Sequence, residues 1–264
     1  MPIFSSRLAA RLSALLASTA LIGLPASAQT VGTAAAVNPA TEGALGNATR
    51  TLKLGSEIIS NETVRTSASG STQIMFVDKT TLTIGPSSSV KIDNYVFNPA
   101  ANTGEATLTF GKGIMRFVGG EISHNDRVII KTPTATIGVR GGTVTIAHGP
   151  DGTRVILHYG TADVSNACGS VVIRRGGYAV SIAGPGECPS APEKATKPEI
   201  DEALAFLTSG PGQTGGGTFT GLGPKTNNTY TGLNAPILDI DGLVREAAEQ
   251  FNSRSAQTCP YGSC

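Results

Sequence analysis

Tryptophan is absent from this 264-residue chain, and aromatic residues of all kinds make up 5% of it. A hydrophobic core therefore has to be built mainly from valine, isoleucine and leucine, which together with threonine suit β-strands. Glycine is abundant, with 33 residues, and glycine is a frequent turn residue. The composition predicts a β-rich protein with many turns.

Charge is also scarce, and neither sign dominates. The whole chain has 20 basic and 19 acidic residues. Arg7 and Arg11 lie within positions 1–28, and without them 18 basic side chains against 19 acidic ones leave a formal charge of −1. A near-neutral chain lacks the electrostatic footprint that marks proteins binding nucleic acid or an anionic membrane surface. We therefore expect no nucleic-acid partner.

Long hydrophobic runs are missing as well. The apolar stretch at residues 12–24 is shorter than the roughly 20 residues that span a bilayer. Arg7 and Arg11 flank its start, and residues 25–28 supply a proline and then the small residues of a cleavage site. We expect residues 1–28 to be a cleaved signal peptide, the mature chain to be periplasmic, secreted or on the cell surface, and no segment to be a transmembrane anchor.

Cysteine does not occur before position 168. The four cysteines are Cys168, Cys188, Cys259 and Cys264. In an exported protein such cysteines form disulfides, and of the three possible connectivities we favour the two local pairs, Cys168–Cys188 and Cys259–Cys264. The first pair brackets a predicted hairpin. A metal site is disfavoured because no histidine is near and the cysteines are widely spaced, so no metal or cofactor is expected.

Short alternating runs fill the chain between residues 52 and 182. Gly, Pro, Asn, Asp or Ser bounds each run, which is typical of all-β folds. The predicted strands are 72–77, 80–84, 90–92, 106–110, 114–118, 128–131, 143–147, 154–159, 160–164, 171–174 and 178–182.

A strand-then-glycine pattern recurs along this region. It ends at Gly55, Gly85, Gly111 and Gly138, at similar but unequal intervals. Stacked coils of a β-solenoid produce repeats of this kind. The unequal intervals also suit a rolled β-meander or a sandwich. The predicted fold is all-β, with these architectures as alternatives.

Composition divides the chain into four segments. They are the signal peptide at 1–28, a loose leader at 29–50, a β domain at 51–188 and a Gly/Pro-rich tail at 189–264. A first strand reached after a flexible stretch is the alternative for the leader. Apolar residues at helical spacing predict two short helices in the tail, at 199–207 and 239–251.

The most distinctive stretch runs from residue 128 to residue 146. Two β-type runs flank a break at Pro133, which cannot donate to a strand ladder and therefore belongs at an edge or corner. The residues that carry the pattern are Thr132, Pro133, Gly138, Val139, Arg140 and Gly141. Their order and spacing resemble the TPxAxxxVRG signature of the FecR family.

Three earlier segments extend this resemblance. Residues 55–66 look like the family's GDxIxTxxxxRT segment, and residues 108–118 look like one of its strand pairs. Residues 70–88 resemble its GxxxLxFxDGSxLxLGxxS core, with Lys79 where the family usually has glycine. The resemblance covers about residues 52–165.

Familiar members of this family relay signals between outer-membrane transporters and cytoplasmic sigma factors. They carry a cytoplasmic segment and a membrane helix ahead of the domain, and neither is expected here. The resemblance therefore implies a stand-alone, exported and non-catalytic interaction module that contacts an envelope protein or glycan, with a role in surface signalling. Exposed strand edges offer a route to partners through β-strand addition. The alternative is a structural or adhesive secreted β-solenoid that self-associates.

An enzyme is not expected. The sequence has no nucleophile elbow and no phosphate-binding glycine loop between a strand and a helix. His124, His148 and His158 are not predicted to meet, so they offer neither a zinc site nor a catalytic base. No catalytic residue is assigned.

Four charged residues receive structural interpretations. Arg140 is expected to bind backbone carbonyls at a strand corner, with binding of a ligand anion as the alternative. Asp78 is expected to make an Asx-type bond in a turn. Arg65 and Arg116 are expected to be solvated charges on strands.

Overall fold

The computed structural model describes residues 29–39 and 41–205. The predicted signal peptide, the pair Cys259–Cys264 and the predicted helix at 239–251 lie outside the described residues.

The described residues form one 15-stranded mixed sheet and two helices, which confirms the all-β prediction. The elements are β1 (Thr30–Val37), β2 (Thr41–Leu45), β3 (Ala48–Thr51), β4 (Glu57–Ile59), β5 (Thr63–Thr66), β6 (Thr72–Phe76), β7 (Thr81–Ile84), β8 (Ser89–Asn98), β9 (Thr103–Val118), α1 (Glu121–Asn125), β10 (Val128–Lys131), β11 (Thr136–Gly149), β12 (Gly152–Ser165), β13 (Ser170–Ile173), β14 (Tyr178–Ile182), β15 (Glu193–Lys194) and α2 (Lys197–Ala205).

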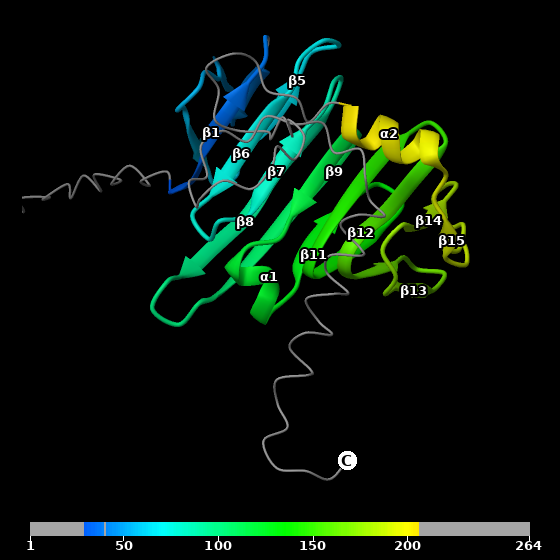
Figure 1. The fold of residues 1–264 in the computed structure, drawn as a ribbon. Coiled ribbons are helices and arrows are strands. Elements are labelled where there is room, and N and C mark those ends of the chain that lie inside the picture. Colours follow the sequence, from blue (N-terminus) through cyan, green and yellow to red (C-terminus); the bar gives the residue numbers. More distant parts are fainter. Residues whose placement is uncertain (1–28, 40, 206–264) are drawn as a thin grey trace, which may run out of the picture.

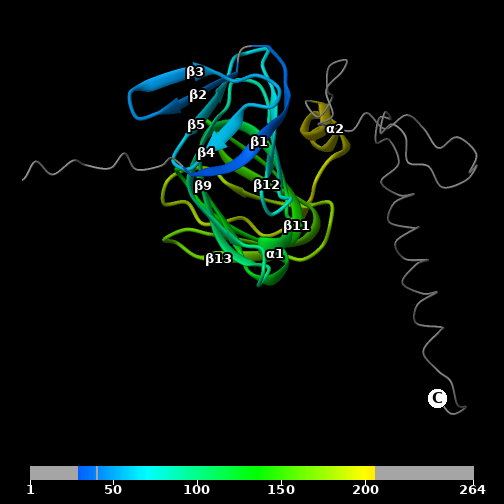
Figure 2. The ribbon, with the colours of Figure 1, turned by 90° about the vertical axis from the view of Figure 1, so that its left-hand side faces the viewer.

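Three long strands, β9, β11 and β12, hold two layers together. In the first layer, the second half of β9 lies between β7 and β11, and the first half of β12 lies between β11 and β14. In the second layer, the first half of β9 lies between β8 and β10, and the end of β12 lies between β11 and β13. The long strands run side by side in Figure 1, and Figure 2 shows how the sheet curves over on itself.

Glycine allows these strands to continue through the bend. Gly113 (φ +99°) and Gly160 (φ +82°) adopt the left-handed conformation that a side chain disfavours. Where β11 and β12 cross the bend, a Cβ on Gly160 would lie 2.5 Å from the carbonyl oxygen of Gly141. The sequence pattern predicts that a strand ends at Gly111. Strand β9 instead continues through Gly111 and Gly113, so the predicted strands 106–110 and 114–118 form one strand.

One hydrophobic core fills the space between the two layers. Leu108, Phe110, Met115 and Phe117 alternate along β9 and are fully buried in it. Most other core residues are valine, isoleucine and leucine, as the composition predicts.

The fold is a rolled β-meander, which was one of the predicted alternatives. Among the described strands, β9 and β10 form the one parallel pair, and the other neighbours are antiparallel. Successive coils of a β-solenoid would stack in parallel. The glycine-ended runs therefore do not mark coils.

The prediction of a loose leader at 29–50 is wrong. Strands β1 and β2 and the start of β3 occupy this segment, and β1 pairs with both β6 and β4. Val31 and Ala34 are fully buried. Gly32 lies so close to β6 that a Cβ on it would be 2.7 Å from the carbonyl oxygen of Met75. Small residues make the segment look unstructured in the sequence, and the same small residues let β1 pack tightly.

The predicted disulfide between Cys168 and Cys188 is confirmed, with Cα atoms 5.0 Å apart. The hairpin predicted between these cysteines is wrong. Strands β13 and β14 do not pair into a hairpin; both pair with β12, one after the other along the same edge. The disulfide therefore ties the chain just before β13 to the loop that follows β14.

The first part of the predicted tail belongs to the β domain, which extends past residue 188. Strand β15 pairs with β14, and α2 places Ile200 and Ala203 against Ile156 and Ala179 on the outside of the sheet (Figure 1). The helix predicted at 199–207 is thus present as α2. Neither helix in the described part of the chain is long and apolar enough to cross a membrane.

Candidate functional site

The outer face of the second layer carries exposed polar side chains. Successive residues of a strand point to opposite faces, so Val139 of β11 is buried in the core while its neighbour Arg140 lies on the outer face. Thr161 of β12 is the direct cross-strand partner of Arg140. Strand β13 continues this face with Val172 and Arg174.

Three arginines on this face surround a small cavity of about 230 Å³. Arg127 comes from the loop before β10, Arg140 from β11 and Arg174 from the residue after β13. We call the seven lining residues the arginine cup: Arg127, Gly138, Arg140, Thr161, Asp163, Val172 and Arg174.

Gly138 creates the hollow in the arginine cup. Its φ lies outside the left-handed region, so the backbone does not require glycine here. A Cβ at this position would lie 3.5 Å from Cδ of Arg127 and 3.8 Å from Cβ of Asp163, both ordinary contacts. A larger side chain would fit the backbone but would fill the cup. Glycine therefore matters here because it leaves space.

The arginine cup has an excess of positive charge. Nη1 of Arg127 lies 3.3 Å from Oδ2 of Asp163, and this is the single carboxylate in the lining. Arg140 and Arg174 are exposed, and neither guanidinium bonds to any other part of the described chain. Two guanidiniums are thus available to an anion from outside. The near-neutral composition of the whole chain gives no sign of this local excess.

The expected contact of Arg140 with backbone carbonyls is not formed. Because its guanidinium has no partner to lose, Arg140→Ala is expected to change the free energy of unfolding by less than about 0.5 kcal/mol. Chemical denaturation of the wild type and the variant measures this difference. A loss of about 2 kcal/mol or more would instead show that the arginine supports the fold.

The other residues of the TPxAxxxVRG pattern shape the strands that carry the arginine cup. Pro133 lies at the tight turn between β10 and β11, where the backbone N–H of Thr132 donates to the carbonyl oxygen of Ala135 (2.8 Å). This confirms that the proline occupies a corner. Gly141 (φ +52°) begins the bend of β11 directly after Arg140.

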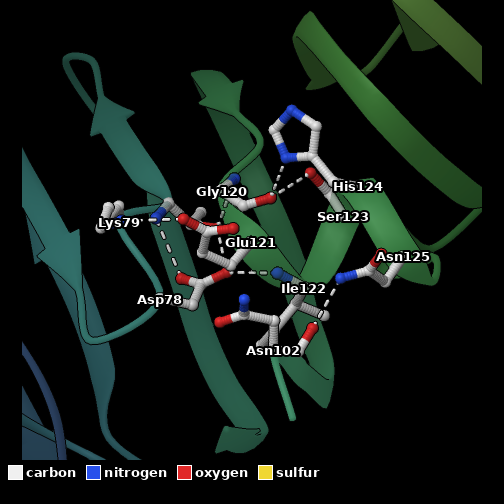
Figure 3. Close-up of polar contacts among 10 residues, drawn as sticks. Asp78, Lys79, Asn102, Gly120, Glu121, Ile122, Ser123, His124 and Asn125 are labelled. Atoms are coloured by element: carbon white, nitrogen blue, oxygen red, sulfur yellow. Dashed lines mark hydrogen bonds and ion pairs between the residues drawn. The ribbon is translucent and has the colours of Figure 1, made fainter. Parts of the chain in front are cut away.

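A second polar cluster surrounds Asp78 and is buried (Figure 3). The carboxylate accepts hydrogen bonds from the backbone N–H of Thr80 (2.9 Å), the hydroxyl of Thr80 (2.8 Å), the hydroxyl of Tyr95 (2.6 Å) and the backbone N–H of Ile122 (3.1 Å). The bond to Thr80 N–H confirms the predicted Asx-type turn. The other bonds join this turn to β8 and to the start of α1, so Asp78 acts as a structural anchor.

The surroundings of Asp78 leave no group there free to react. Burial and the neighbouring Asp78 carboxylate raise the pKa of Tyr95 far above its usual range, so the phenol stays protonated. Lys79 has φ +69°, a conformation that favours glycine, and its ammonium pairs with Glu121 (2.8 Å) on the surface. The positive φ accounts for the glycine that is usual at this position of the pattern.

Of the two strand arginines expected to be solvated, Arg65 is exposed and Arg116 is not. Burial lowers the pKa of Arg116, and its Nε is buried without a hydrogen-bond partner. Burial, and then the charge of Arg116, lower the pKa of His158 to about 4, so this imidazole is neutral near pH 7. Its Nε2 lies 2.8 Å from the hydroxyl of Thr145.

The histidines and a second cavity are two further places in the described chain where a site could form. Within residues 29–39 and 41–205, no group of three or more His, Cys, Asp or Glu side chains could hold a metal ion. An open groove of about 660 Å³ lies between the β11–β12 turn and α2. Its Arg154 is already paired with Glu193 (2.6 Å) and Glu199 (3.0 Å), so these charges hold α2 and β15 in place.

Sequence reasoning found two of the seven residues of the arginine cup, Gly138 and Arg140. Strand alternation alone places both on one face of β11. The remaining residues come from three other segments, and only the observed register of β11, β12 and β13 brings them together.

Comparisons with known proteins identify the central part of the chain. No curated protein matches the sequence. Two solved structures of a proposed anti-sigma factor from Parabacteroides distasonis ATCC 8503, at 1.65 and 2.50 Å resolution, are 10% and 11% identical, with TM-scores of 0.43 and 0.44. Each comparison covers 54% of this chain, and the chain spans less than two thirds of those proteins, 64% and 63%.

The family model described as FecR protein matches residues 62–163. The matched segment contains the Asp78 anchor and five of the seven residues of the arginine cup. Residues 62–163 of this chain form a FecR domain.

Proposed function

We propose that this chain is an exported, non-catalytic interaction module of the cell envelope, and that its partner contacts the arginine cup. A FecR domain supports a signalling or regulatory role in general. The observation that carries the proposal is the pair of unpartnered guanidiniums, Arg140 and Arg174, beside a cavity on an exposed sheet face of the described chain.

The chemistry of the arginine cup favours binding over catalysis. Arginine stays protonated at any pH at which a protein is folded, so it is a poor general acid or base. Thr161 is the one hydroxyl in the lining, and no histidine lies in that lining to take its proton. The lining therefore suits recognition of an anion.

Export is supported by two features. Residues 1–28 have the pattern of a cleaved signal peptide. The disulfide between Cys168 and Cys188 is a bond that persists in oxidising compartments such as the periplasm or the cell exterior.

A structural role through self-association is the second candidate. Strands β3, β4, β13 and β15 each pair on one side only within the described chain. Such edges can pair with another copy of the same protein.

Site-specific crosslinking in intact source cells tests the proposal. We would place a photo-crosslinking residue at position 172 of the full chain, in the lining of the cup, and in a control at position 96, an exposed strand valine outside it. Both guanidiniums, Arg140 and Arg174, are then retained. The proposal predicts that position 172, but not position 96, captures an envelope protein. Capture of only further copies of this chain would favour self-association, and equal capture from both positions would contradict a role for the cup.

A further inference from the structure

The arginine cup lies next to a free strand edge. Strand β13 pairs with β12 on one side, and no backbone bond within the described chain occupies its other side. Val172 of β13 and Arg174, which follows it, face the same side as the cup. A cation-lined cavity and an unpaired strand edge therefore form one continuous surface.

We propose that this surface binds an extended acidic segment of a protein partner, a proposal that rests on the interaction role given above. The backbone of the segment pairs with the edge of β13. A glutamate or aspartate side chain of the segment reaches over β13 into the arginine cup. Its carboxylate accepts hydrogen bonds from the guanidiniums of Arg174 and Arg140.

The size and charge of the cup favour a carboxylate. A cavity of about 230 Å³ is smaller than the roughly 300–1,000 Å³ of sites for drug-sized ligands, so it suits a single small group. Guanidinium forks match the geometry of a carboxylate. The cup already holds one carboxylate, Asp163 on Arg127.

The remaining lining favours a peptide over a glycan. No aromatic ring lines the cup to stack against a sugar. Its one carboxylate, Asp163, already bonds to Arg127 through Oδ2. Only a polypeptide offers the regular N–H and C=O groups that the edge of β13 can pair with.

Binding to defined probes tests this proposal on the full mature chain. The main probe is a fluorescent peptide of alternating glutamate and valine. Matched probes replace glutamate with glutamine, or carry N-methyl groups on alternate backbone nitrogens. Inorganic phosphate and a uronic-acid oligosaccharide serve as competitors. Fluorescence anisotropy at low salt gives the dissociation constants.

We expect the glutamate peptide to bind, and the glutamine and N-methylated peptides to bind at least tenfold more weakly. Arg140→Gln and Arg174→Gln should each weaken binding about tenfold or more, since a hydrogen bond between two charged groups is roughly twice as strong as one between neutral groups. Arg65→Gln, which removes the same charge outside the cup, should have no effect.

Gly138→Val provides a second test that leaves the charge unchanged. Its side chain fits the backbone but fills the cup, so the variant should fold and lose binding. Equal binding by all variants, or stronger competition by phosphate or the oligosaccharide than by the peptide, would overturn the proposal. If crosslinking at position 172 still captures an envelope protein in that case, the interaction role survives and only the acidic-segment chemistry fails.

Discussion

Replacing Asp78 with alanine is expected to lower the free energy of unfolding by about 4 kcal/mol. The carboxylate is fully buried and accepts four hydrogen bonds, from Thr80, Tyr95 and Ile122. Its removal leaves buried donors without acceptors, and breaking a buried charged network commonly costs about 3–5 kcal/mol. Urea denaturation followed by circular dichroism measures the loss.

Tyr95→Phe is the matched control for this prediction. It removes one donor and leaves the carboxylate with its other three bonds, so we expect a loss of about 1–1.5 kcal/mol. If the two variants lose the same small amount, Asp78 is not the anchor between the β6–β7 turn, β8 and α1 that the contacts indicate.

Replacing Arg50 with alanine is expected to cost about 3 kcal/mol. Glu62 has a fully buried side chain, and its two carboxylate oxygens accept from Nε (2.9 Å) and Nη2 (3.0 Å) of Arg50. Arg50 also donates to the carbonyl oxygen of Glu57. The substitution leaves a buried carboxylate without its cation, which is more costly than losing an exposed pair. Thermal and chemical denaturation report the change.

Two further variants test whether the loss of stability comes from this ion pair or from removing any arginine. Arg65→Ala removes an exposed strand arginine and should change stability by less than about 0.5 kcal/mol. Adding Glu62→Gln to Arg50→Ala removes the stranded charge and should restore part of the loss. Absence of any such recovery would show that the arginine acts through packing alone.

The parts of the fold that depend on local signals could be predicted from sequence. Strand β10 is present at the predicted residues, Pro133 lies at a corner, and Asp78 makes its Asx-type bond to Thr80. Each of these features depends on side chains within a few positions along the chain. Local chemistry is sufficient to specify them.

Features that depend on long-range packing could not be predicted. Asp78 meets Tyr95 and the backbone of Ile122, which lie 17 and 44 positions away. Likewise, Gly138 and Arg140 fall on one face by alternation, but Arg174 joins them only through the register of two further strands. A period-2 pattern defines the faces of a strand and leaves its neighbours undetermined.

The disulfide makes the arginine cup sensitive to the redox chemistry of its surroundings. Cys168 lies shortly before β13, and its bond to Cys188 restrains the short strand that carries Val172 and leads to Arg174. When the disulfide is reduced, the strand is still held by its pairing with β12, which involves four residue pairs. Reduction of this bond is therefore expected to loosen the side of the cup that Val172 and Arg174 form. The binding of an acidic segment proposed above should then weaken under reducing conditions and recover when the disulfide forms again.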